Sequence, residues 1–177
     1  MNKEIKMKLQ KVRCLILDVD GVLTDGGIII DDNGQELKKF DVRDGHGLKL
    51  VMRCDISVVI LTGRQSQVVS HRAKELGITA IYQKATNKIK TLDEIMEKYC
   101  WDAETIAYIG DDIVDVPVLR RVGFGVAVAD ASIHAKKASC YVTDSPGGKG
   151  AVREVCEMIL QAQGRWDEIV EKYNLIG

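Results

Sequence analysis

Residues 15–27 of this chain, LILDVDGVLTDGG, form an apolar run that stops at Asp18 and Asp20 and then becomes rich in glycine. A short apolar run bounded by charge and glycine is typical of a strand buried on both faces of a parallel sheet. Residues two apart on a strand point to the same side, so both carboxylates are expected at the carboxyl end of this strand, where ligands bind in open α/β sheets. Paired carboxylates there indicate Mg²⁺ and phosphate chemistry, although a lone Asp-x-Asp of this kind is more often a solvated turn.

Strands and helices are predicted to alternate along the rest of the chain. After the strand at 14–19, the sequence predicts strands at 56–61, 80–82, 105–109, 125–128 and 141–142. Helices are predicted at 2–12, after 43–47, at 65–76, 88–99, 113–121 and 132–137, and after the Gly-rich loop 145–150. This alternation predicts an α/β fold with a doubly wound, Rossmann-like parallel sheet. No change of composition marks a domain boundary, so residues 1–177 are expected to form one domain.

Two segments depart from this alternation. Residues 26–41 are predicted to form a hairpin flap, because Asn33-Gly34 is a strong turn signal between two extended segments. An isolated hairpin cannot bury the isoleucines at 28–30, so we expect it to pack against another subunit. The tail, 164–177, is predicted to be an amphipathic helix that needs a partner surface. Its apolar face is formed by Trp166, Ile169, Val170 and Tyr173.

Composition excludes several classes of protein. The chain has 25 Lys and Arg against 26 Asp and Glu, so it lacks the basic field expected of a protein that binds nucleic acid by bulk electrostatics. Its five cysteines are scattered and odd in number, which argues against a zinc cluster or a disulfide framework. We expect no membrane span and no signal peptide, and therefore a cytoplasmic protein.

Further polar residues follow the other predicted strands. Thr62, Gly63 and Arg64 follow the strand at 56–61, and Lys88 begins a helix. Asp111, Asp112 and Asp115 follow the strand at 105–109. Carboxylates supply the hard oxygen ligands that Mg²⁺ prefers, and a hydroxyl, backbone N–H groups and a lysine suit a transferring phosphoryl group. One carboxylate would be the nucleophile, and its neighbour would donate and later accept a proton.

These residues fall in motifs that resemble those of the haloacid dehalogenase superfamily. The motifs are DVDGVLTD at 18–25, LTGR at 61–64, Lys88 and GDDIVD at 110–115. The resemblance implies that Asp18 is the nucleophile and a Mg²⁺ ligand, that Asp20 is the general acid/base and a metal ligand through its backbone carbonyl, and that Asp111 is the third metal ligand. It also implies that Thr62 and the Gly63 N–H bind the phosphoryl oxygens and that Lys88 offsets charge. Asp115 is expected to orient Lys88 or a metal-bound water.

One branch of the superfamily is more similar still. The hairpin in place of a cap domain, FDVRDGHGLK at 40–49 and GGKGAVREV at 147–155 resemble tetrameric phosphatases that act on an eight-carbon sugar-acid phosphate of lipopolysaccharide synthesis. In that branch the hairpins associate between subunits and the tails help to close neighbouring active sites. The resemblance places Arg43, Asp44, Gly45, Lys49, Arg64 and Arg72 among the substrate-binding residues, with Asp20, Gly63 and Lys88. The Gly-rich loop is expected to be a lid.

Other functions stay open at this point. The nearest alternative is a phosphatase for a nine-carbon, sialic-acid-like sugar phosphate. A phospho-accepting module of the receiver type, and a non-catalytic tetramerising domain of the same fold, are alternatives of a different class.

Overall fold

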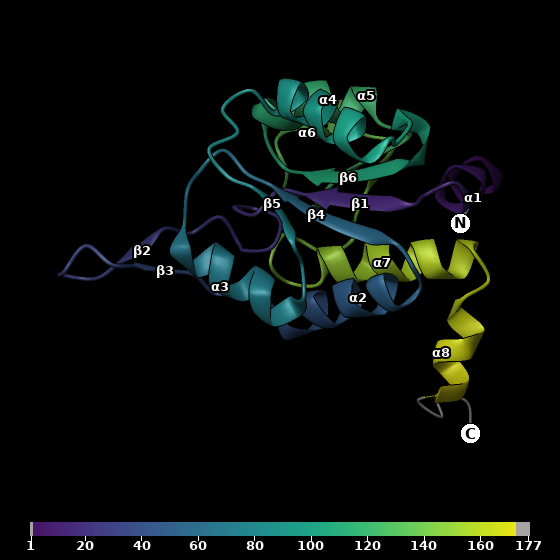
Figure 1. The fold of residues 1–177 in the computed structure, drawn as a ribbon, viewed down its shortest axis with the longest axis horizontal. Coiled ribbons are helices and arrows are strands. Elements are labelled where there is room, and N and C mark those ends of the chain that lie inside the picture. The colour runs from purple at the N-terminus through teal and green to yellow at the C-terminus, as the bar shows by residue number, and fades with distance from the viewer. Residues whose placement is uncertain (1, 173–177) are drawn as a thin grey trace.

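The computed structural model describes residues 2–172, in which a six-stranded sheet lies between two layers of helices (Figure 1). The strand order is β5-β4-β1-β6-β7-β8, and every neighbouring pair is parallel. The strands are β1 (Cys14–Leu17), β4 (Ser57–Leu61), β5 (Ala80–Tyr82), β6 (Ile106–Gly110), β7 (Phe124–Ala127) and β8 (Tyr141–Val142). The predicted doubly wound, Rossmann-like α/β fold is confirmed.

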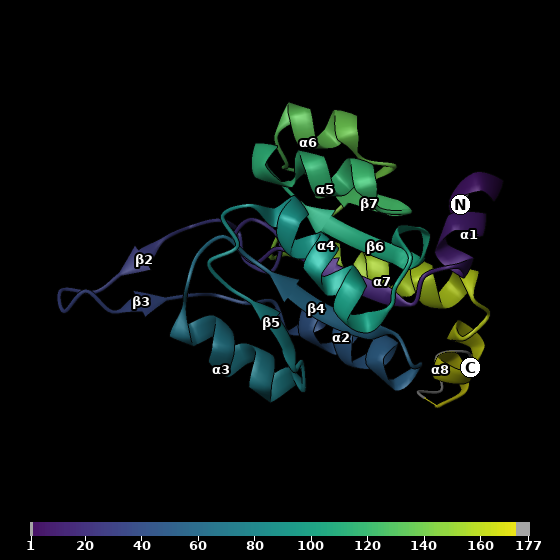
Figure 2. The ribbon, with the colours of Figure 1, turned by 45° about the horizontal axis from the view of Figure 1, so that its top comes forward.

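Helices cover both faces of the sheet. Figures 1 and 2 show α4, α5 and α6 on one face and α2, α3 and α7 on the other. The helices are α1 (Lys3–Gln10), α2 (Val42–Arg53), α3 (Gln67–Leu76), α4 (Lys88–Tyr99), α5 (Val116–Arg121), α6 (Ile133–Ala138), α7 (Ala151–Ala162) and α8 (Trp166–Lys172), with 3₁₀ turns η1 (Ala103–Thr105) and η2 (Ile113–Asp115). No helix in 2–172 is both long and apolar enough to cross a membrane.

The central strand β1 determines where polar side chains emerge from the core. All of its residues are fully buried between β4 and β6, and Leu17 is paired in register with Ile60 on one side and Ile109 on the other. Asp18 is the next residue, and its backbone N–H still donates to the carbonyl oxygen of Ile109 at 3.1 Å. The first polar side chain after β1 is therefore fixed at the carboxyl edge of the sheet.

Two predicted helices differ from the observed ones for local reasons. The helix predicted over 65–76 begins at Gln67, because Ser66 is its N-cap and accepts a hydrogen bond from the Val69 N–H at 3.4 Å. The helix predicted over 113–121 is divided into η2 and α5. Pro117 lies in the first turn of α5, where its missing N–H costs least.

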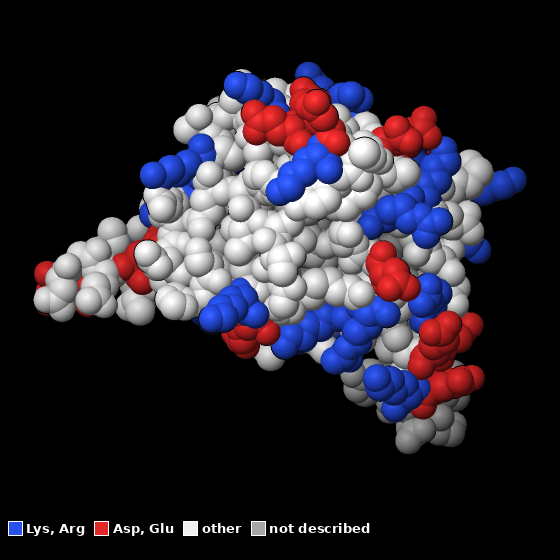
Figure 3. Space-filling model, viewed as in Figure 1, with Lys and Arg blue, Asp and Glu red and all other residues white. Residues whose placement is uncertain are grey.

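The hairpin is present but short. It consists of β2 (Ile29–Ile30) and β3 (Glu36–Leu37), which pair antiparallel and project from the body of the molecule (Figure 1). Figure 3 shows a largely uncharged surface along it, and the isoleucines at 28–30 are 59, 50 and 61% exposed. The chain itself therefore does not cover these apolar side chains, as the sequence predicted.

The tail lies at the opposite end of the molecule from the hairpin (Figure 1). Ile169 of α8 is buried in the hydrophobic core, and the half-buried Trp166 packs against the same core. The prediction that this helix needs a partner surface is therefore wrong for its first turns, because the body of the chain already covers them. Tyr173, the last residue of the predicted apolar face, lies outside the described residues.

Candidate active site

A cavity of about 360 Å³ opens at the carboxyl ends of β1, β4 and β6. Its walls come from the segments that follow these strands and from the start of α4, so residues far apart in sequence meet there. The sequence-predicted residues that line it are Asp18, Asp20, Thr62, Gly63, Arg64, Lys88 and Asp111. Placing polar residues after parallel strands thus assembles them at one edge of the sheet.

Lys88 lies between two carboxylates. Its Nζ is 2.9 Å from Asp18 Oδ2 and 2.6 Å from Asp115 Oδ1, and the three side chains are at most 9% exposed. Tyr108, from β6, donates a hydrogen bond to Asp115 Oδ1 at 2.5 Å. Burial opposes the charge on Lys88, but the two carboxylates outweigh it and raise the pKa of Lys88. A charged lysine therefore fixes one oxygen of Asp18.

Asp115 also shapes the turn that carries Asp111. Its Oδ2 accepts hydrogen bonds from the backbone N–H groups of Asp111, at 2.9 Å, and Asp112, at 3.2 Å. The loop after β1 approaches this turn closely at Gly21. A Cβ on Gly21 would lie 2.2 Å from Asp111 Oδ2, and its φ of +88° is a conformation that favours glycine. Glycine at this position allows the two loops to meet.

The acidic groups of this cluster fit a divalent cation. Asp18, Asp111 and Asp115 each place a carboxylate oxygen within 4.8 Å of the others. Asp18 Oδ1 is buried with no hydrogen-bond partner among the described residues. Burial, together with the carboxylates of Asp18 and Asp115, raises the pKa of Asp111 to about 7. A hard cation such as Mg²⁺ would offset these like charges and take up the unpaired oxygen. Since the oxygens of Asp115 already accept hydrogen bonds, Asp18 and Asp111 are the available ligands.

Asp20 belongs to a different set of contacts. Its Oδ1 pairs with the ammonium group of Lys38, which also lies 3.2 Å from Glu36 Oε1. Arg64 Nη2 is 2.9 Å from the same Glu36 oxygen, and Arg64 Nε is 3.8 Å from Asp20 Oδ2. Two acids and two cations thus alternate in a closed ring, which we call the hairpin ring. Ser66 Oγ donates to Glu36 Oε2 at 2.5 Å and ties the ring to the start of α3.

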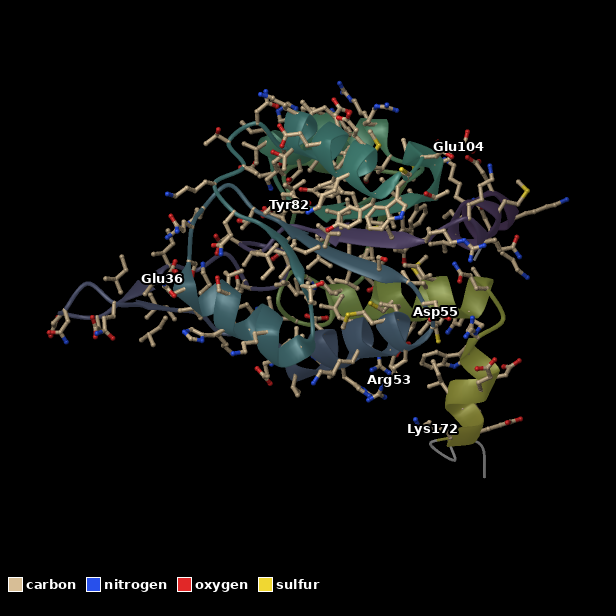
Figure 4. All side chains as sticks on the ribbon, in the orientation of Figure 1. Glu36, Arg53, Asp55, Tyr82, Glu104 and Lys172 are labelled. Carbon is tan, nitrogen blue, oxygen red and sulfur yellow. The ribbon has the colours of Figure 1, made fainter. Side chains whose placement is uncertain are left out.

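The sequence reasoning missed Glu36 and Lys38. Figure 4 shows Glu36 at the root of the hairpin, beside the amino-terminal end of α3. Residues 36 and 38 are two apart on an extended segment, so they point to the same side, while Leu37 between them is 55% exposed. The signal that could have found them is a pair of opposite charges two residues apart, Glu36 and Lys38, on the second extended segment of the predicted hairpin.

The structure places two predicted substrate-binding residues outside this cavity. Asp44, in the first turn of α2, is buried, and its carboxylate accepts hydrogen bonds from the backbone N–H groups of Gly150, at 3.2 Å, and Arg153, at 2.8 Å. It therefore supports the first turn of α7. Arg43 is mainly exposed, and its Nη2 lies 2.9 Å from Asp41 Oδ2.

Three further predicted substrate residues also lie outside the cavity, on α2 and α3. Arg72 pairs with Glu75 at 2.8 Å, and its guanidinium group is 5.7 Å from the centre of the Phe40 ring. Gly45 allows α3 to come close, because a Cβ there would lie 2.4 Å from Arg72 Nη2. Lys49, on α2, is half-buried. None of the three lines the Asp18 cavity of its own chain.

The Gly-rich loop before α7 supports the site from outside the cavity. The Gly148 N–H donates to the carbonyl oxygen of Val22 at 2.8 Å, and a Cβ on Gly147 would lie 1.8 Å from the carbonyl oxygen of Gly21. The loop packs against the segment that follows Asp18 and does not line the cavity of its own chain, and its role as a lid stays a prediction.

Comparison with known proteins identifies close relatives. Residues 77–155 match the haloacid dehalogenase-like hydrolase family. The 3-deoxy-D-manno-octulosonate 8-phosphate phosphatase KdsC of Escherichia coli (strain K12) is 47% identical over 168 residues, which cover 95% of this chain and 89% of that protein.

Solved structures agree with this match. The same phosphatase from Yersinia pestis superposes with a TM-score of 0.93 at 43% identity, covering 94% of this chain and 90% of that one. The Moraxella catarrhalis enzyme, in complex with magnesium ion, phosphate ion and KDO, superposes with a TM-score of 0.96 at 40% identity, covering 98% and 99%. The chain therefore belongs to the 3-deoxy-D-manno-octulosonate 8-phosphate phosphatase family of the haloacid dehalogenase-like hydrolases.

Proposed function

We propose that this protein is a Mg²⁺-dependent phosphatase that hydrolyses 3-deoxy-D-manno-octulosonate 8-phosphate to the sugar acid and inorganic phosphate, in lipopolysaccharide biosynthesis. One observation carries the proposal. Asp18 is held by Lys88, keeps one buried oxygen without a partner and faces Asp111, in a chain 47% identical to a phosphatase of that substrate.

The reaction proceeds in two transfers. Asp18 attacks the phosphorus atom, the bond from phosphorus to the sugar oxygen breaks, and Asp20 protonates the departing alkoxide. Asp20 then removes a proton from water as the water attacks the aspartyl phosphate, which releases phosphate and restores Asp18. Such a covalent intermediate divides one difficult hydrolysis into two easier steps. The same side chain serves as acid and then as base because it begins the second step ionised.

The remaining groups of the cavity stabilise charge. Asp18, Asp111 and the backbone carbonyl of Asp20 would hold the Mg²⁺ ion, which when bound would neutralise part of the phosphoryl charge. Lys88 keeps Asp18 oriented and offsets negative charge beside it. Thr62 and the Gly63 N–H bind the phosphoryl oxygens.

Recognition of the sugar acid, which carries a carboxylate as well as a phosphate, requires cations beyond Lys88. We infer that Arg64, which lies at the cavity, and Arg43, Lys49 and Arg72, on α2 and α3, serve the substrate carboxylate and hydroxyls in a homotetramer. Asp44 and Gly45 then act by holding α2 against its neighbours. Arginine suits this task because it binds a carboxylate through two parallel hydrogen bonds. The exposed isoleucines of the hairpin supply the contact between subunits.

We place the protein in the cytoplasm, where its substrate would be made. All five cysteines are free thiols in the structure, which is the usual state in a reducing compartment.

Phosphate release tests the proposed function. The purified protein is assayed with and without Mg²⁺ on 3-deoxy-D-manno-octulosonate 8-phosphate, a nine-carbon sialic-acid-type 9-phosphate and common sugar phosphates. We expect metal-dependent turnover with a strong preference for the first compound. Preference for the nine-carbon compound would keep the chemistry and change the substrate, whereas no turnover of any compound by the folded protein would refute a phosphatase.

A further inference from the structure

We propose that Lys38, carried by the hairpin, is a positioning residue for the general acid/base Asp20. The inference rests on the proposed function, since it concerns how Asp20 reaches the leaving group. Its basis is a contact that none of the motifs of the site includes, between the ammonium group of Lys38 and Asp20 Oδ1.

The side chain of Lys38 is buried, unlike the lysine of a typical surface ion pair. Its side chain is 2% exposed, whereas that of Arg64, the other cation of the hairpin ring, is 44% exposed. The ammonium group has carboxylates on two sides, Asp20 on the β1 loop and Glu36 on its own strand. A buried ammonium group with two carboxylate partners is held in one place, and it holds its partners in return.

The contact decides where the Asp20 carboxylate lies. Asp20 is only two residues from Asp18, yet its carboxylate is not part of the Asp18, Asp111 and Asp115 cluster. The Asp20 carboxylate belongs to the hairpin ring instead, in which Lys38 contacts one of its oxygens and Arg64 lies 3.8 Å from the other. The carboxyl group of an acid that protonates a leaving group must stay free of the nucleophile and the metal ion. Lys38 holds the Asp20 carboxylate apart from both.

Glu36 fixes the position of Lys38, although the hairpin that carries both residues is short. The Glu36 carboxylate bridges Lys38 and Arg64 and accepts the Ser66 hydroxyl. These contacts join β3 to the segment between β4 and α3, so the ammonium group is placed by the body of the protein as well as by the hairpin. The pKa of Glu36 is lowered by the Ser66 hydrogen bond first and then by Lys38 and Arg64, which agrees with a permanently ionised bridge.

The test compares two phosphate esters that differ in their need for an acid. A sugar phosphate releases an alkoxide, which must be protonated, whereas p-nitrophenyl phosphate releases a stabilised phenolate that leaves without a proton. The measured quantity is kcat/KM for both esters, because it reports the steps up to the first irreversible transfer. Variants Lys38→Gln and Lys38→Arg are compared with wild type and with Lys39→Gln, which removes the exposed neighbouring lysine.

We expect Lys38→Gln to lower kcat/KM for the sugar phosphate about tenfold or more, as part of the roughly 10²–10⁴ that a general acid contributes, and to affect the aryl ester only about threefold or less. Lys38→Arg restores most of the loss, and Lys39→Gln matches wild type. In Asp20→Asn, adding Lys38→Gln causes no further selective loss. The ratio of the two esters is measured on the same folded molecules, so a lower folded fraction does not change it.

Equal losses for both esters would overturn the inference, because they would give Lys38 a general structural or binding role. An additive loss in the double variant, or a crystal structure of Lys38→Gln with Asp20 in its original position, would overturn it as well. Failure of the proposed function is a separate result, since it appears as wild-type protein that does not hydrolyse the sugar-acid phosphate.

Discussion

Replacing Lys88 by Met should destabilise the fold more than any surface substitution. The change removes a charge that is 3% exposed and leaves the carboxylates of Asp18 and Asp115 facing each other without a cation. Methionine keeps the length and most of the volume of the side chain, so the effect comes from charge and not from a cavity.

The size of the effect follows from the two distances. At an effective dielectric constant of about 20, ion pairs at 2.9 and 2.6 Å are each worth roughly 6 kcal/mol before desolvation. The cost of burying the lysine offsets most of this attraction, and removing one partner of a buried ion pair typically costs about 3–5 kcal/mol. For a chain of 177 residues, such a loss lowers Tm by roughly 10 °C.

Urea and thermal unfolding, followed by circular dichroism in the presence of a chelator, measure this change without a metal ion that could replace the lysine. The matched control is Lys90→Met, two residues further along α4, where the lysine is exposed and a change below about 0.5 kcal/mol is expected. A loss for Lys88→Met no larger than the control would refute the reasoning, because the buried carboxylates would then not depend on this cation.

The pH dependence of the same variant has a definite sign. Burial raises the pKa of Asp18 while Lys88 lowers it, so removing Lys88 raises it further. A carboxyl whose pKa is raised by folding binds more protons in the folded state, and its contribution to stability falls as pH rises between the unfolded and folded values. The stability gap between wild type and Lys88→Met should therefore widen from acidic to neutral pH. A constant gap would show that the loss is not electrostatic.

Three other substitutions test separate parts of the site and surface. Asp18→Asn should abolish phosphate release while cooperative unfolding persists, and substantial residual turnover would mean that another residue attacks. Gly21→Ala should cost about 1–2 kcal/mol for its positive φ and weaken Mg²⁺ binding by calorimetry more than tenfold, because the added Cβ meets Asp111 at 2.2 Å; an unaltered affinity would contradict this. Ile29→Asp should reduce the mass measured by light scattering, whereas an unchanged mass would exclude the hairpin interface.

The fold was predictable because the central strands of its sheet are buried on both faces. The run at 14–17 is fully buried, so its sequence is apolar throughout and its end is marked by charge. Helix and strand limits were harder to predict, because they depend on single contacts such as the capping hydroxyl of Ser66. The tail shows a different limit. Its apolar face predicts that something covers it, and only the three-dimensional structure shows that the core of the same chain covers Trp166 and Ile169.

The site was predictable where residues follow a strand of the main sheet. Asp18, Thr62 and Asp111 each follow a strand of a sheet that the alternation of strands and helices predicts to be parallel, so they meet at one edge. The contacts of the residues on α2 were not predictable in this way, because the sequence does not specify which neighbour each face of a helix contacts. Asp44 turns toward α7 and binds its first turn, a use that no local pattern in the sequence specifies.

The two aspartates that follow β1 are held by two different lysines with buried side chains. Lys88 is buried at the start of α4 and holds Asp18, the proposed nucleophile. Lys38 comes from a hairpin on which the cross-strand pair Ile29 and Leu37 is exposed, and a two-stranded hairpin is only marginally stable by itself. In the proposed tetramer, a partner subunit that covers Leu37 would therefore also steady Glu36 and Lys38, whose side chains point to the other side of the same strand. The alternation of side chains along this strand would thus couple subunit contact on one side to the position of Asp20 on the other.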